Sequence, residues 1–166
     1  MKTRLIAAEA PAEAQDVKAY REAIQAGQPG SYRYVSLLGI RQQDPLLIVK
    51  RVKRGLTFQT FERFQRNTKL STADVAEAVA ISMRTLHRRK EQGRLEPDES
   101  DRLVRFSRIF GRTLQLFEGN LDTARRWLST PIDALGGERP IALAKTDVGA
   151  REVEALIDRL EQGVLT

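Results

Sequence analysis

Two serines, Ser71 and Ser82, each stand directly before a short helical pattern, and this arrangement constrains the fold more than any other feature of the sequence. Serine is a favoured N-cap because its hydroxyl accepts a backbone N–H from the first turn of a helix. The apolar residues spaced to form a small core between the two helices are Val75, Val79, Ile81 and Leu86. The sequence therefore predicts a helix-turn-helix between Leu70 and Lys90.

The second of these helices is polar and basic, as expected of a helix that enters the major groove of DNA. Such a helix reads base edges with residues near its N-terminus. Arginine can donate two hydrogen bonds to guanine, whereas serine and threonine more often contact phosphates. The predicted DNA-binding residues are Ser82, Met83, Arg84, Thr85, Arg88 and Arg89. Arg89 is expected to steady the DNA backbone, and the alternative is a surface helix whose charges are merely solvated.

Caps, prolines and glycines predict further helices, so that the expected fold class is all-α. The segments concerned are residues 17–25, 45–54, 57–67, 97–110, 120–128 and 147–161. Gly111 is expected to end the helix that begins at Pro97. Residues 32–39 are the one β-like stretch. Phe58, Phe61 and Phe64 lie three apart on one stripe, which favours a place in the core.

Basic charge is concentrated in the middle of the chain. The net charge is +6, and residues 51–112 hold fifteen Lys and Arg against eight Asp and Glu. Residues 120–166 hold six against eight and are slightly acidic. This distribution indicates two partners of different sign, one of them a polyanion.

Enzymatic and membrane functions find no support in the sequence. With no cysteine and a single histidine, His87, the chain cannot assemble a usual zinc site, and nothing supports a Ser-His-Asp triad. No apolar run approaches the roughly 20 residues that span a bilayer, and no signal peptide is recognisable. We therefore expect a cytoplasmic protein that is not an enzyme and has no catalytic residue, metal, cofactor, membrane contact or small-molecule substrate.

The most distinctive motifs follow one another in the last fifty residues. They are Trp127-Leu128, Pro131, Leu135-Gly136-Gly137 with Pro140, Thr146 with Gly149, and Gly163. This order resembles the toxin-binding domain of the Xre/MbcA/ParS antitoxins, although the alanine before Trp127 lies three residues upstream rather than two. Upstream motifs at residues 81–89 and 99–103 resemble the same family, and the likeness covers about residues 32–166.

The resemblance implies a division of the chain into three parts and a set of partners. It places an N-terminal arm at residues 1–31, a helix-turn-helix domain at 32–116 and a toxin-binding domain at 117–166. Members of this family are encoded with RES-type toxins, which resemble ADP-ribosyltransferases and deplete NAD. The implied protein is a homodimer that blocks the active-site cleft of its toxin and binds operator DNA to repress its own operon.

By the same resemblance, the final helix and its surroundings carry the toxin contacts. The expected residues are Lys145, Arg151, Glu154, Asp158, Arg159 and Gly163. Trp127, Gly137 and Gly149 are expected to be structural. Two alternatives remain open: a stand-alone transcriptional regulator whose C-terminal module only dimerises, and an enzyme acting on a nucleotide.

Overall fold

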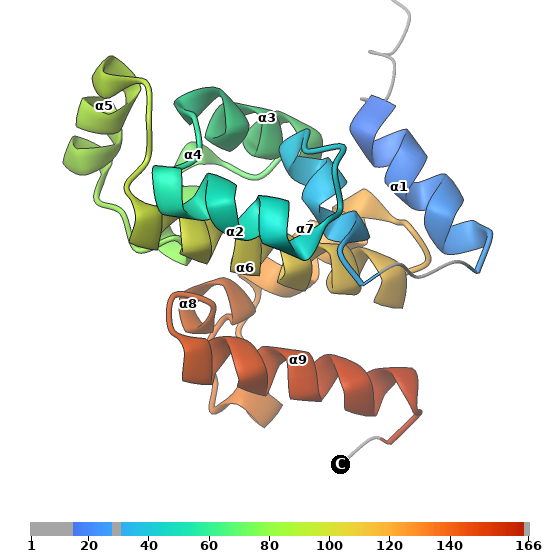
Figure 1. Ribbon diagram of the computed structural model, residues 1–166. Helices are drawn as coiled ribbons and strands as arrows, with labels where there is room; N and C mark the ends of the chain where they lie inside the picture. Colours follow the sequence, from blue (N-terminus) through green and yellow to red (C-terminus); the bar gives the residue numbers. More distant parts are fainter. Residues whose placement is uncertain (1–14, 28–30, 165–166) are drawn as a thin grey trace, which may run out of the picture.

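The computed structural model describes residues 15–27 and 31–164, and every regular element within them is a helix (Figure 1). In chain order the elements are α1 (Gln15–Gln25), η1 (Arg33–Leu38), α2 (Pro45–Arg54), α3 (Phe58–Thr68), α4 (Thr72–Ala78), α5 (Met83–Gln92), α6 (Pro97–Leu116), α7 (Leu121–Ser129), η2 (Asp133–Leu135), α8 (Pro140–Leu143) and α9 (Asp147–Glu161). The all-α prediction is confirmed. Residues 1–14 of the expected arm lie outside the described residues.

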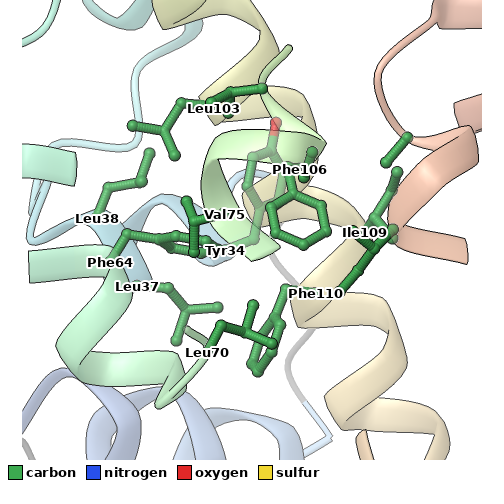
Figure 2. Close-up of a cluster of buried hydrophobic side chains, with 14 of the residues drawn as sticks. Tyr34, Leu37, Leu38, Phe64, Leu70, Val75, Leu103, Phe106, Ile109 and Phe110 are labelled. Carbon is green, nitrogen blue, oxygen red and sulfur yellow. The ribbon is translucent and has the colours of Figure 1, made fainter. Parts of the chain in front are cut away.

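The long helix α6 is the element on which most of the others pack. It contacts η1, α2 and α4 on one side and α7 and α9 on another. Phe64 of α3 meets Phe106 and Phe110 of α6 edge-on, with ring centroids 5.7 and 6.0 Å apart. Figure 2 shows Phe106 in this cluster and Ile109 on the side of α6 that faces the C-terminal ribbon. One contiguous core therefore includes residues from both halves of the chain.

The β-like stretch at residues 32–39 is instead the 3-10 helix η1, so the β prediction is wrong. Its buried side chains are Tyr34, Val35, Leu37 and Leu38. Burial of neighbouring residues is incompatible with a half-buried strand, whose side chains alternate between two faces. A 3-10 helix forms its own backbone hydrogen bonds and needs no partner strand. The segment wedges between α1, α3 and α6.

Helix α6 runs through Gly111 to Leu116, so the predicted stop at Gly111 is also wrong. A Cβ at this position would lie 2.6 Å from the hydroxyl oxygen of Tyr20 and 3.0 Å from the Cβ of Tyr34. The glycine thus provides room for α1 and η1 against α6. Burial in this contact raises the pKa of Tyr20 to about 12.

The cap signals placed the other helices to within about two residues. The Asp44 side chain accepts a hydrogen bond from the backbone N–H of Leu46 at 2.8 Å, and α2 begins at Pro45 as predicted. Asn120 likewise accepts from the backbone N–H of Thr123 and precedes α7. The three phenylalanines of α3 are buried, which confirms their place in the core. In the described part of the chain, no helix has both the length and the apolar character needed to cross a bilayer.

Helix α1 packs on the core rather than standing apart from it. Val17 and Tyr20 are buried. Arg63 of α3 donates from Nε and Nη2 to the carboxylate of Asp16 at 2.7 and 2.8 Å, and the amide of Asn67 donates to it at 2.8 Å. Burial alone raises the pKa of Asp16, but these hydrogen bonds and the charge of Arg63 outweigh burial and hold that pKa below its ordinary value.

We expect Asp16→Ala to lower the free energy of unfolding by about 1–3 kcal/mol, because hydrogen bonds to a charged group are lost. In the native protein this contribution is present above the unfolded pKa of about 4 and is lost as the pH falls through the lower folded pKa. Urea unfolding at pH 7 and pH 3 measures both effects. Glu22→Ala, an exposed change on the same helix, should stay within about 0.5 kcal/mol; an equal effect of the two substitutions would contradict the anchoring role.

Candidate functional site

Helices α4 and α5 form the helix-turn-helix that the sequence predicted. The Ser71 hydroxyl accepts from the backbone N–H of Asp74 at 3.0 Å, and the Ser82 hydroxyl accepts from that of Thr85 at 3.1 Å. The four residues expected in the small core between the helices are all buried. The turn passes through Ala80, whose φ of 53° is left-handed. Sequence reasoning did not predict this conformation, because alanine does not favour that region.

The exposed face of α5 carries most of the residues predicted to bind DNA. Ser82, Met83, Arg84 and Arg88 are all exposed. Thr85 is half-buried, and its hydroxyl lies 3.0 Å from that of Ser82. Helix α5 lies at the edge of the molecule (Figure 1), and among the described helices it packs most closely on α4. The face that a groove would meet is therefore polar, cationic and accessible.

Arg89 points the other way, into a buried ion pair with Glu99 of α6. Its Nε lies 2.9 Å from both carboxylate oxygens of Glu99, and its Nη2 lies 2.8 Å from one of them. Only 12% of the Arg89 side chain and 7% of the Glu99 side chain are exposed. Glu99 also accepts from the backbone N–H of Glu96 at the start of α6. Arg89 thus holds α5 against α6, in place of the exposed position expected for a DNA contact.

At the C-terminal end, α9 is docked along α6 by apolar packing and by ion pairs. Its inward side chains, buried against the core, are Val153, Leu156 and Ile157. Arg108 of α6 donates to Glu154, and Arg112 donates to Asp158. These pairs were not foreseen, because nothing in either helix alone reveals its partner.

A close approach between α8 and α9 fixes the start of the last helix. A Cβ on Gly149 would lie 2.0 Å from the carbonyl oxygen of Leu143. The structural role expected of Gly149 is therefore confirmed. Trp127 is half-buried, with its ring centroid 6.2 Å from that of Phe117, and also packs against the core.

The residues expected to contact a toxin occupy different faces of this module. Glu154 is half-buried and faces α6, whereas Lys145, Arg151 and Gly163 are exposed. Asp158 remains 54% exposed despite its ion pair with Arg112. Arg159 is half-buried, and its Nε is buried without a hydrogen-bond partner among the described residues.

The sequence analysis overlooked an exposed apolar residue on α9. Val148 is 73% exposed and lies three and four residues before Arg151 and Glu152, which places the three on one outward face. An apolar residue on the polar side of an amphipathic helix is the signal that reveals such a position. Within residues 15–27 and 31–164, no cluster of three or more metal-ligating side chains is present.

The loop before α8 links this module directly to the helix-turn-helix. Arg139 donates to both carboxylate oxygens of Glu77 of α4, at 2.7 and 2.8 Å. Arg102 of α6 donates to the carbonyl oxygen of Val79, at the turn between α4 and α5, at 2.7 Å. The two surfaces are thus parts of one packed structure.

Two known protein families match this chain, one over the helix-turn-helix and the other over the C-terminal part. Residues 48–108 match the antitoxin Xre-like helix-turn-helix domain, and residues 113–163 match the antitoxin Xre/MbcA/ParS C-terminal toxin-binding domain. A protein named Antitoxin Xre from Yersinia enterocolitica serotype O:8 / biotype 1B is 35% identical over 130 residues, which cover 78% of this chain and 88% of that relative.

Two further relatives with the same name show the same likeness. The protein from Photorhabdus laumondii subsp. laumondii is 31% identical over 116 residues, covering 69% of this chain and 78% of the relative. The protein from Pseudomonas putida is 36% identical over 84 residues, covering 50% of this chain and 52% of the relative.

Proposed function

The chain belongs to the Xre family of antitoxins. We propose that it neutralises a RES-type, NAD-depleting toxin and represses its own operon. The proposed mechanism of neutralisation is occlusion, in which residues 117–166 close the NAD-binding cleft of the toxin. The outward face of α9 carries the proposal, because Val148, Arg151 and Glu152 are exposed there while the opposite face packs on α6. The protein then acts as a non-enzymatic regulator in the cytoplasm.

The charge of α9 supports this choice of partner. The helix holds five Asp and Glu against two Arg, and a cleft that binds the phosphates of NAD requires cations. Glu154, Asp158 and Glu161 are paired with arginines of α6, and Asp147 is paired with Arg151. Among the five carboxylates this leaves Glu152 outside these pairs, exposed one turn after Val148. An exposed apolar side chain with charged neighbours matches the usual pattern of an interface, in which an apolar centre is surrounded by a polar rim.

Co-expression with the toxin encoded beside this chain tests the proposal. We expect the double substitution Val148→Asp with Glu152→Lys to abolish rescue of growth and to weaken toxin binding by about 2 kcal/mol or more, or about thirtyfold. Co-purification and growth measure the two effects. Point substitutions are used because deleting α9 would uncover the core along α6.

Glu22→Lys on α1 is the control, since it changes charge on an exposed helix away from α9 and should leave rescue intact. Full rescue by the α9 double variant would contradict the proposed surface. No rescue even by the wild-type protein would instead favour a regulator whose C-terminal module only dimerises.

For repression, we propose that a homodimer inserts one α5 from each protomer into successive major grooves of a pseudo-palindromic operator. Half-sites about one helical turn apart follow from this geometry. Arg84 and Arg88 are proposed to read guanines, while Ser82 and Thr85 contact phosphates. Met83, 49% exposed near the start of α5, is available for an apolar contact with a base.

Arg84→Ala and Arg88→Ala are each expected to weaken operator binding by about 1–3 kcal/mol, because a bidentate base contact is lost. Fluorescence anisotropy with a duplex from the region upstream of the chain's own gene measures the change. Lys145→Ala removes one exposed charge from the C-terminal module and should leave affinity unchanged. Undiminished binding by the Arg84/Arg88 double variant would exclude α5 as the reader.

A further inference from the structure

A polar groove of about 610 Å³ lies between the helix-turn-helix and α7, and the proposed function gives it no role. One wall comprises residues 69–71 and Asp74, at the corner between α3 and α4. The opposite wall consists of Asp122, Arg125, Arg126 and Ser129, all of which lie in α7. The groove thus joins the two halves of the chain.

Arg125 forms hydrogen bonds to both walls of the groove, whereas the neighbouring side chains of Lys69 and Arg126 are exposed. Its Nη1 donates to the carbonyl oxygen of Lys69 at 3.0 Å, and its Nη2 donates to Asp122 at 2.6 Å. Lys69 and Arg126 are both exposed, and neither side chain forms an ion pair within the described residues. The groove therefore has a fixed frame with two accessible cations at its rim.

The groove continues the surface that leads from α5. Thr72, the residue after Ser71, accepts a hydrogen bond from the amide of Gln65 at 2.6 Å. Gln65 and Thr72 also line a smaller hollow together with Met83 and His87 of α5. The groove and this hollow therefore flank the start of α4, the groove toward α7 and the hollow toward α5.

We propose that this groove seats the sugar-phosphate backbone of duplex DNA, with Lys69 and Arg126 binding phosphates beside the half-site read by α5. The inference rests on the proposed DNA binding and extends it to a helix of the C-terminal module. In a helix-turn-helix complex the first helix crosses the DNA backbone, and here that helix is α4. Lysine, arginine and serine are the side chains that commonly contact phosphates, and all three line the groove.

The charges in the groove suit a phosphate chain better than an acidic protein segment or a small anion. Asp122 is paired with Arg125, so Lys69 and Arg126 face Asp74 as the remaining carboxylate. This small positive excess is spread along an open groove, so it would bind a single ion only weakly. It would, however, add phosphate contacts to an extended polyanion that is already bound at α5. The hydroxyls of Ser71 and Ser129 can donate further hydrogen bonds to phosphate oxygens.

The test compares Lys69→Gln and Arg126→Gln in the full-length protein with the charge-matched control Lys18→Gln on the exposed side of α1. Affinity is measured against salt concentration for two duplexes of equal length, one from upstream of the chain's own gene and one of unrelated sequence. Each groove variant should weaken binding to both duplexes alike and lower the slope of log K against log salt by about 1. The Lys18→Gln control should match the wild-type protein in its affinity for both duplexes and in its salt slope.

Three outcomes would overturn the inference. Groove variants that bind like the control show that the phosphates lie elsewhere. Groove variants that lose co-purification with the toxin but keep their DNA affinity assign the groove to the toxin. Loss of affinity for the upstream duplex alone assigns it to base reading. A wild-type protein that binds neither duplex, or an Arg84/Arg88 double variant that binds normally, would instead refute the proposed function on which the inference rests.

Discussion

Replacing Arg89 by alanine is expected to lower the free energy of unfolding by about 3–5 kcal/mol and to abolish DNA binding, although Arg89 points away from the exposed face of α5. The substitution leaves the Glu99 carboxylate buried without its cation. It also releases α5 from the start of α6, so that the residues proposed to read bases lose their orientation. Urea unfolding and anisotropy with the upstream duplex measure the two effects.

A double-mutant cycle with Glu99→Gln isolates the ion pair. Because the pair acts as a unit, Arg89→Ala should cost much less in the Glu99→Gln background than in the wild type. Arg88→Ala is the matched control on the same helix. It should weaken DNA binding while leaving the free energy of unfolding within about 0.5 kcal/mol of the wild type.

Both substitutions are thus expected to reduce DNA binding, but only Arg89→Ala is expected to lower the free energy of unfolding substantially. Additive costs in the cycle would contradict the buried pair. If Arg89→Ala kept wild-type stability and weakened only DNA binding, Arg89 would be a direct DNA contact, as its sequence position first indicated.

Replacing Phe106 by alanine is expected to destabilise the protein by about 3–5 kcal/mol and to impair toxin neutralisation and DNA binding together. Phe106 is fully buried in α6 and packs edge-on against Phe64. Because α6 also carries the docking site of α9, the cavity weakens the support of both surfaces. Growth rescue, anisotropy and urea unfolding measure the three consequences.

The single tryptophan allows a test of whether the two halves of this core unfold together. Trp127 lies on α7, so its fluorescence reports on the C-terminal module, whereas circular dichroism reports on all helices. The two signals should unfold at the same urea concentration in the wild type and in Phe106→Ala. A C-terminal transition that stays in place while the helical signal shifts would show that the modules unfold separately. Ile109→Val, a smaller change in the same helix, should cost about 0.5–1.5 kcal/mol.

The features that sequence reasoning predicted correctly depend on neighbouring residues. Ser71 and Ser82 accept hydrogen bonds three residues ahead, and Pro45 needs only its place in the first turn of α2. The exposed position of Arg84 and Arg88 follows in the same way from the period of α5 around its one buried residue, Leu86. Interactions between residues close in sequence were therefore enough to predict the helix-turn-helix and the exposed face of α5.

The features that were missed depend on contacts across the fold. Gly111 is a stop signal in isolation, but in the structure it provides space for Tyr20, which lies far earlier in the chain. Arg89 is one cation among several in α5 until Glu99 of the next helix is placed beside it. Residues 33–38 combine strand-forming side chains with a place between three helices, and burial decided their conformation.

Both the helix-turn-helix and α9 pack on α6, and this arrangement limits how the protein can diversify by recombination. A crossover after residue 116 would join a foreign α9 to the resident Arg108 and Arg112, and a crossover ahead of Pro97 would separate Arg89 from Glu99. Either junction produces a hybrid with at least one ion pair whose members have not evolved together. A change of toxin partner is therefore expected to arise by substitution on the outward face of α9, which can vary without disturbing the helices beneath it.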